Sequence, residues 1–217
     1  MAVFYPQGDI AHRAYAVLRE QGFKSFWFKV AAELGYRRLI LLERSLLQPV
    51  NPPAQTLPLR FDILDESQID DFLAFRPQLP QAEVLMRLRA GNVCFTARDR
   101  GRLVSAAWTT TGRAWTDFLG CEITIGAGEA YLFDAFTHPA YRGQGVAPAL
   151  CFHQLAHFQR AGLRRVVRAT LPENLPALRA HLKCGFHPHA LIRRMKIGPW
   201  QYSFQRRWQA RASLPAG

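Results

Sequence analysis

The sequence predicts an α/β fold, a mixed sheet with helices on its faces, preceded by an N-terminal helical extension. From residue 59 onward the hydrophobic periodicity reads β-α-α-β-β-β-α-β-α-β-β, which is typical of sheets covered by helices. A proline-rich stretch over 48–58 separates this region from the segments before it. With 217 residues, 49% of them hydrophobic and 20% charged, the chain has the composition of an ordinary folded protein.

The first 34 residues predict two amphipathic helices. Apolar side chains recur at helical spacing over 10–18, and Gly22 ends that helix. The second helix, over 23–34, mixes aromatic residues with lysines, and Gly35 follows it as a stop. Such a helix can lie on a membrane surface, but docking on the protein's own core or on a second subunit is favoured.

Residues 36–46 predict a strand with an aliphatic centre, and the segment that follows is a linker. Four prolines stand between Gln48 and Pro58, and proline removes a backbone donor and disfavours both helix and strand. We therefore expect residues 1–56 to form an N-terminal extension of helices, strand and linker. Residues 57–217 are expected to form the main domain.

The main domain begins with a strand and two short helices. Alternation over 59–63 predicts a half-buried strand. A helix over 67–75 follows, with Ser67 as its N-cap, and a second helix over 82–90 ends at Gly91. The later elements are a hairpin of strands over 93–98 and 103–110, an irregular Gly- and Thr-rich segment over 111–129, a strand over 130–137, a helix over 146–161, a strand over 164–170, a helix over 174–183, and strands near 186–197 and 201–208.

The net charge of +12 is concentrated in the last third of the chain. Residues 1–56 carry +3, residues 57–133 carry −2 and residues 134–217 carry +11. A polyanionic partner would therefore meet the C-terminal part. Nucleic acid, an anionic membrane and a phosphate-rich cofactor all fit this charge, as does a merely solubilising surface.

The cysteines and the N-terminus favour a cytoplasmic protein without a metal site. The four cysteines stand far apart in the sequence and form no CxxC or Cys/His cluster, which marks neither a zinc site nor a nucleophile: Cys94, Cys121, Cys151 and Cys184. Scattered cysteines are typical of buried residues in a reducing compartment. The first residues do not resemble a signal peptide, and the aliphatic run over 39–42 is far too short to span a bilayer.

The most informative segment, 131–148, runs from a strand through a glycine-containing loop into a helix. Gly143 and Gly145 let the backbone turn tightly and approach a phosphate without a Cβ in the way. Because the helix begins at about Val146, its unpaired N–H groups and the positive end of its dipole face the loop. The segment therefore predicts an anion-binding site.

Two other glycine-loop patterns fit this segment poorly. A P-loop requires Lys followed by Ser or Thr after its second glycine, whereas Val146 and Ala147 stand here. A dinucleotide-binding fingerprint requires GxGxxG with an acidic residue about 20 positions further on, whereas the region downstream is basic.

Two short motifs follow each other along the second half of the chain. The first, [RQ]-x-x-G-x-[GA], is matched by Arg142-Gly143-Gln144-Gly145-Val146-Ala147. The second, N-x-x-A-x-x-x-Y-x-x-x-G-F, is matched at every position but one by Asn174-x-x-Ala177-x-x-x-His181-x-x-x-Gly185-Phe186. In this order, with a helix and a strand between them, they resemble the motifs of the GNAT (GCN5-related) N-acetyltransferase superfamily. The resemblance covers about residues 59–208.

The resemblance implies a mostly antiparallel, twisted sheet with helices on both faces, and acetyl-CoA or another acyl-CoA as co-substrate. The strand at Phe136 and Thr137 would splay from its neighbour, and its backbone would hold the pantetheine arm and the thioester carbonyl. Asn174 would help to position that arm. The pyrophosphate would be bound by the backbone N–H groups of Arg142, Gly143, Gln144, Gly145, Val146 and Ala147.

The same resemblance leaves three main candidates for the chemistry. The leaving thiolate needs a proton source, and His181 stands where the family usually has a tyrosine. Tyr131 and Asp134 are candidate bases, although Asp134 can equally be a buried carboxylate that is hydrogen-bonded for structure. On a regular strand these two residues face opposite sides unless a bulge intervenes. Glu122 and Glu129 are weaker candidates.

The predicted function is acyl-CoA-dependent N-acyltransfer, with acetyl as the expected acyl group, directly to the primary amine of a small molecule or amino sugar. Trp108, Trp115 and the segment 111–129 are expected to line the acceptor side. A homodimer and peripheral membrane contact through residues 23–34 remain open, as does a GNAT-fold protein without robust turnover. Nucleic-acid binding is the less favoured alternative, because no recognisable motif accompanies its basic and aromatic residues. Those residues are Arg193, Arg194, Lys196, Arg206, Arg207 and Arg211, with Trp200, Tyr202, Phe204 and Trp208.

Overall fold

The structure is a computed structural model that describes residues 35–52, 57–116, 118–197 and 200–207. The two helices predicted within the first 34 residues therefore lie outside the described residues, as do Trp208 and Arg211.

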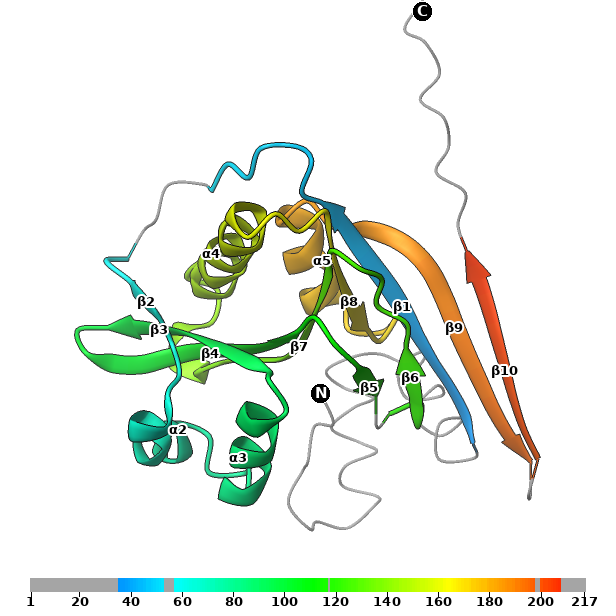
Figure 1. The fold of residues 1–217 in the computed structure, drawn as a ribbon, viewed down its shortest axis with the longest axis horizontal. Coiled ribbons are helices and arrows are strands. Elements are labelled where there is room, and N and C mark those ends of the chain that lie inside the picture. The colour runs from blue at the N-terminus through cyan, green and yellow to red at the C-terminus, as the bar shows by residue number, and fades with distance from the viewer. Residues whose placement is uncertain (1–34, 53–56, 117, 198–199, 208–217) are drawn as a thin grey trace, which may run out of the picture.

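Eight strands form one sheet in the order β10-β9-β1-β8-β7-β4-β3-β2, and β5 and β6 form a separate hairpin (Figure 1). The pair β7–β8 is parallel and the other pairs are antiparallel. The predicted mixed, mostly antiparallel sheet is therefore confirmed. The strands are β1 (Tyr36–Ser45), β2 (Arg60–Ile63), β3 (Val93–Asp99), β4 (Arg102–Thr110), β5 (Ala114–Thr116), β6 (Cys121–Ile123), β7 (Glu129–Thr137), β8 (Arg165–Thr170), β9 (His187–Ile197) and β10 (Trp200–Arg207).

Helices cover both faces of the sheet (Figure 1). On one face α4 (Val146–Arg160) and α5 (Leu175–Lys183) pack, and on the other α2 (Ile69–Phe75) and α3 (Gln81–Arg89). Consecutive residues of a strand point to opposite faces, so Cys94 enters the core under α2 and α3 while Phe95 enters the core under α4. Both side chains are fully buried, and burying a phenylalanine contributes about 2–3 kcal/mol.

Strand β1 lies in the middle of the sheet, between β8 and β9. It pairs antiparallel with both neighbours, Ile40 opposite Thr170 and Leu39 opposite Ile192. Leu42 is fully buried in the core under α4. The strand predicted over 36–46 is thus confirmed, and a segment assigned to the extension completes the sheet of the main domain.

Local boundaries match the predictions to within a residue or two, with two differences. The first concerns Ser67: the N-cap is Asp65, whose side chain accepts from the Ser67 N–H at 2.7 Å and starts the 3-10 turn η1 (Glu66–Gln68) before α2. The cap was misplaced because Asp and Ser are both good N-caps and stand two residues apart. The second is that the segment 111–129 contains the hairpin β5–β6.

Candidate active site

The glycine loop between β7 and α4 has the geometry of an anion site. Gly143 and Gly145 both adopt left-handed backbone conformations, with φ of 78° and 80°. Other residues are strained there by about 1–2 kcal/mol, which explains why glycine stands at both positions. Gly145 begins α4 with no side-chain hydrogen bond to the helix end, so the N–H groups of the first turn can face a ligand.

Side chains around the loop hold its shape while leaving its outer side open. Gln144 Nε2 donates to the carbonyl oxygen of Ala140 at 2.7 Å. The Tyr141 hydroxyl donates to Asp99 Oδ2 at 2.9 Å and joins the loop to the β3–β4 turn. A Cβ on Gly143 would meet no atom of the described residues within 4 Å. There is therefore room for a bulky anion against the backbone.

Strands β7 and β8 separate before β7 ends. Their parallel register stops at the pair of Leu132 and Arg168, although β7 continues to Thr137. Beyond Leu132, within the described part of the chain, β7 pairs with β4 alone. The splay predicted at Phe136 and Thr137 is therefore present, and the N–H and C=O groups of this edge can bond an extended ligand as a neighbouring strand would.

A β-bulge in β7 reorients Asp134. The register of β4 against β7 shifts between Ala106 and Trp108, which leaves Asp134 and Ala135 opposite a single residue. Asp134 adopts φ of 42°, a left-handed conformation that is uncommon outside glycine. The bulge breaks the alternation of β7, and the side chain of Asp134 turns toward α2 and α3, the face on which Phe133 packs.

Asp134 is held there by two arginines. Its Oδ1 accepts from Arg76 Nη2 at 3.1 Å and its Oδ2 accepts from Arg87 Nη1 at 2.5 Å. Burial alone would raise the pKa of Asp134, but the charges and hydrogen bonds of Arg76 and Arg87 outweigh burial and hold that pKa below its usual value. A carboxylate stabilised in this way is a poor proton acceptor. The geometry therefore matches the alternative that Asp134 is a buried carboxylate hydrogen-bonded for structure.

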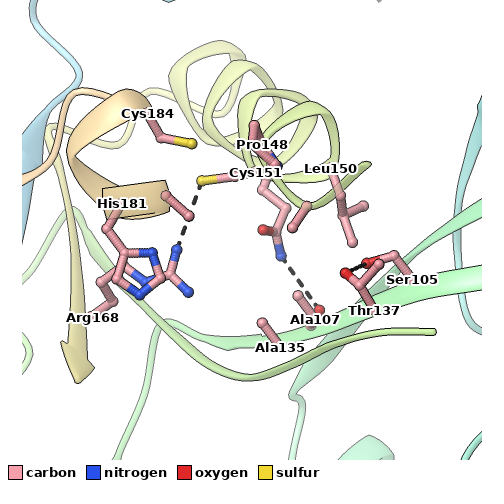
Figure 2. A pocket seen from close by; sticks show the side chains of 13 residues that line it. Ser105, Ala107, Ala135, Thr137, Pro148, Leu150, Cys151, Arg168, His181 and Cys184 are labelled. Carbon is pink, nitrogen blue, oxygen red and sulfur yellow. Dashed lines mark hydrogen bonds between the residues drawn. The ribbon is translucent and has the colours of Figure 1, made fainter. Parts of the chain in front are cut away.

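A cavity opens between the splayed strands and the helices α4 and α5 (Figure 2). Its volume is ≈ 80 Å³. Of the predicted site residues, Thr137, Ala147 and His181 line it, whereas Asp134 and Tyr131 do not. The full lining consists of Ser105, Ala107, Ala135, Thr137, Ala147, Pro148, Leu150, Cys151, Gln154, Arg168, Ala180, His181 and Cys184.

His181 projects from α5 into this cavity, beside Arg168 (Figure 2). The residue is only 9% exposed, and its ring meets Phe186 edge-on at 6.4 Å. Burial, together with the charge of Arg168, lowers the pKa of His181 to about 2. The imidazole is therefore neutral at physiological pH and carries no acidic proton of the strength that a protonated histidine supplies.

The other acid and base candidates are also held in structural roles. Tyr131 stacks on Phe133 with ring centroids 6.1 Å apart, and burial raises the pKa of Tyr131 to about 12. Glu129 accepts from Arg165 Nη2 at 3.0 Å, at the end of the β7–β8 pair that lies away from the splay. Glu122 is bound by Arg113 at 2.8 Å on the exposed β5–β6 hairpin. None of these three lines the cavity.

The second sequence motif builds the two ends of α5. Asn174 caps the helix, its Oδ1 accepting from the Ala177 N–H at 3.2 Å. Gly185 follows the helix in a left-handed conformation with φ of 76°, and a Cβ there would collide with the guanidinium of Arg44, which donates to the carbonyl oxygen of Cys184. Positioning of a cofactor arm by Asn174 stays a prediction beside this capping role.

Sequence reasoning missed three residues that the fold brings together at the cavity. Cys151 of α4 and Cys184 after α5 lie far apart in the sequence, yet both side chains line the cavity and interact with each other. Arg168 Nη1 donates to Cys151 Sγ at 3.9 Å. The sequence did offer one sign of this cluster, an arginine at position 168 within an otherwise apolar strand. Counting it only toward the net charge gave it no special role.

The two tryptophans expected on the acceptor side lie in different environments, one in the core and one on the surface. Trp108 is fully buried between Phe72 and Arg87, so the prediction that it lines an acceptor surface is wrong. Trp115 lies on the β5–β6 hairpin and is 62% exposed, so it remains accessible to a ligand. The aromatic pattern could not distinguish a core tryptophan from a surface one.

The open glycine loop, the unpaired edge of β7 and the adjoining cavity fit a long ligand with an anionic end. Together with the fold, these features are typical of an acyltransferase. The family model for the Acetyltransferase (GNAT) family matches residues 61–186, more than half of the chain. The chain therefore belongs to the GNAT family and is an N-acetyltransferase.

Solved structures that are similar to this chain are distant from it in sequence. A GCN5-related N-acetyltransferase from Sphaerobacter thermophilus matches with a TM-score of 0.54 and 16% identity, covering 86% of this chain and 57% of that one. A GNAT-family acetyltransferase structure from Novosphingobium aromaticivorans gives 0.50 and 18%, with coverages of 73% and 65%. Aminoglycoside N-acetyltransferase AAC(6')-Iy, solved in complex with CoA, gives 0.47 and 22%, with coverages of 59% and 91%. Comparison with curated protein sequences gives no match.

Proposed function

We propose that this chain transfers an acyl group, with acetyl as the expected one, from acyl-CoA directly to the primary amine of a small molecule or amino sugar. The observation that carries the proposal is the continuity of the Gly143–Gly145 anion loop with the unpaired edge of β7. The loop would bind the pyrophosphate, and the edge beyond Leu132 would bind the pantetheine arm by strand-like hydrogen bonds.

In this proposal the chain's own groups bind and polarise rather than exchange protons. Backbone N–H groups of the splayed edge would polarise the thioester carbonyl, a contribution that typically reaches several kcal/mol in a water-excluded site. Asp134 serves as an anchor for the bulge through Arg76 and Arg87. The acceptor amine loses its proton to water after it has attacked the thioester carbonyl.

A thermal-shift measurement with acetyl-CoA tests the binding half of the proposal. Gly143→Glu places a carboxylate in the anion loop and should abolish the stabilisation by acetyl-CoA. The matched control is Gly162→Glu at the other end of α4, because Gly162 has the same φ of 78° and the same empty surroundings as Gly143. The proposal fails if folded wild-type protein shows no shift, or if both variants lose it equally.

A panel of small amines and amino sugars with detection of released CoA thiol tests the transfer half. Direct transfer predicts intersecting initial-velocity lines, and it predicts no acetyl adduct on the protein after incubation with acetyl-CoA alone. An acetylated Cys151, seen by mass spectrometry, would instead establish a covalent route. Mass spectrometry of the purified protein for bound CoA species shows which acyl group it carries.

Nucleic-acid binding is a second candidate because β9 and β10 present an exposed aromatic and basic surface. Trp200, Tyr202 and Phe204 are 67%, 46% and 58% exposed, and Arg193 pairs in register with Phe204. Exposed aromatics beside arginines are the groups on which single-stranded bases stack. A thermal shift with oligonucleotides that disappears at high salt would favour this function.

The remaining expectations concern location and assembly. We propose a cytoplasmic enzyme and leave a homodimer and membrane contact through residues 23–34 as its possible associations. That segment lies outside the described residues. Among the described helices, none has the length and hydrophobicity that a membrane-spanning helix requires. Co-sedimentation with liposomes, compared before and after deletion of residues 1–35, tests the membrane contact.

A further inference from the structure

Arg168 is a buried cation for which the described residues provide no carboxylate partner. Its exposure is 8%, and its Nε has no hydrogen-bond partner among the residues that the structure describes. The contacts it makes are to Cys151 Sγ and, 5.5 Å from its Cζ, to the ring of Phe186. Two other arginines that are largely buried, Arg76 and Arg87, each pair with a carboxylate.

A buried charge without a counter-ion costs several kcal/mol, so its retention calls for an anionic partner at some stage. Arg168 is the last residue of β8 in register with β7, which places it where the two strands part. Its guanidinium lines the cavity beside His181 (Figure 2). A cation without a carboxylate partner among the described residues therefore stands at the inner end of the unpaired β7 edge.

The partner must be small and tolerant of apolar surroundings. The cavity of ≈ 80 Å³ has room for a few water-sized groups. Near Arg168 its wall consists of thiols, small side chains and a neutral imidazole, from Cys151, Cys184, Ala180 and His181. These groups suit a large, weakly hydrated anion such as a thiolate better than a carboxylate, which would require further donors.

We infer that Arg168 receives the thiolate of CoA as it leaves the thioester, which makes Arg168 a catalytic residue of the proposed reaction. This inference rests on the proposed function. The amine nitrogen forms a bond to the carbonyl carbon, the C–S bond breaks, and its electron pair goes to sulfur. The thiolate then pairs with the Arg168 guanidinium, and the ammonium proton passes to water. His181 stands beside the sulfur as a neutral group.

The titratable and charged groups around the guanidinium come from four elements. They are Cys151 of α4, His181 of α5 and Cys184 after it, Tyr131 of β7, and Arg44 of β1. Cys151 is the competing anion, because a Cys151 thiolate would itself neutralise Arg168. The Cys151→Ala variant removes that competitor.

The test measures the affinities of CoA and desulfo-CoA by titration calorimetry between pH 6.5 and 9, which requires no acceptor. A cysteine thiol ionises near pH 8.5 in water, and a neighbouring cation lowers the pKa of any thiol that it pairs with. If Arg168 pairs with the thiolate, the preference of wild type for CoA over desulfo-CoA rises with pH, to about tenfold at pH 9. In Arg168→Met the preference should stay near one at every pH, with desulfo-CoA binding within about threefold of wild type.

Two further variants make the result specific. Arg179→Gln removes an exposed cation from α5 and should keep the wild-type dependence on pH. Arg168→Lys keeps the positive charge but loses the planar guanidinium, so it should retain a reduced preference for CoA. This variant tests the inference if Arg168→Met fails to fold.

Four outcomes would overturn the inference. If the preference of wild type for CoA does not change with pH, the thiolate does not pair with Arg168. The same conclusion follows if the pH-dependent preference survives in Arg168→Met. If a pH-dependent preference for CoA emerges only in Cys151→Ala, then in wild type it is the Cys151 thiolate that pairs with Arg168. Tighter binding of succinyl-CoA than acetyl-CoA, lost in Arg168→Met, assigns Arg168 to an acyl carboxylate instead. If wild type binds neither CoA nor desulfo-CoA, it is the proposed function that fails.

Discussion

Arg87 donates from Nη1 to Oδ2 of Asp134 across 2.5 Å, and this contact ties helix α3 to the bulge of β7. The same arginine binds Glu83 at 2.6 Å and covers the ring of Trp108 at 5.2 Å. The bulge is therefore fixed from the α3 side by an ion pair and from within the sheet by its altered register.

Asp134→Asn should destabilise the fold without abolishing acyl-CoA binding. The substitution leaves Arg76 buried without its counter-charge and leaves Arg87 with Glu83 alone, and breaking a buried pair from one side costs about 3 kcal/mol or more. Urea unfolding at pH 7 measures the loss. Glu122→Gln is the matched control, because its ion pair with Arg113 is exposed and should contribute nothing measurable. Equal effects of the two variants would show that the Asp134 pair is not a stabilising anchor.

Much of the local structure of the site could be predicted because it depends on neighbouring residues. Glycines at 143 and 145, followed by an apolar periodic segment, dictate a tight loop and a helix start, and both are present. The bulge at Asp134 could not be predicted from the sequence, because it depends on the register between β4 and β7. It could only be mentioned as a feature that would break the alternation of side chains along the strand.

Long-range pairing was beyond the sequence patterns. Nothing in residues 36–45 indicates that they pair between two strands that lie more than a hundred residues further along the chain. The meeting of Cys151 with Cys184, and of both with Arg168, follows from how α4 and α5 pack over the splayed strands. Contacts of this kind depend on the whole fold, and a single sequence carries no local signal for them.

Stability should fall with acidity in a way that His181 partly determines. Its pKa is about 6.5 in an unfolded chain and about 2 in the folded protein, so the folded state holds it neutral. Its contribution is fully present above pH 6.5 and is lost as pH falls toward 2, by at most about 1.4 kcal/mol per pH unit. Urea unfolding of wild type and His181→Phe from pH 7 to 4.5 should give diverging curves, since carboxylates affect both proteins alike. Parallel curves would contradict a buried neutral imidazole.

The same substitution separates two roles of His181 in turnover. A general acid typically contributes 10²- to 10⁴-fold to the rate, so loss of an essential acid would lower kcat by at least about 100-fold. Because burial and Arg168 keep His181 neutral, we expect His181→Phe to lower kcat by less than about tenfold and to leave the pH profile of kcat unchanged. The measurement uses the best amine from the panel, and a fall of 100-fold or more would make His181 the acid.

Gly185→Ala should destabilise the protein more than Gly162→Ala, although both glycines have left-handed backbones with φ of 76° and 78°. The shared backbone strain costs about 1–2 kcal/mol in each variant. A Cβ at Gly162 meets nothing within 4 Å, whereas one at Gly185 collides with the Arg44 guanidinium. That guanidinium must then give up its hydrogen bond to the Cys184 carbonyl, beside the cavity. Chemical denaturation of the two variants gives the difference, and it should be accompanied by weaker CoA binding in Gly185→Ala alone. Equal losses in both variants would mean that Arg44 moves aside freely and that glycine is required at 185 for its backbone conformation alone.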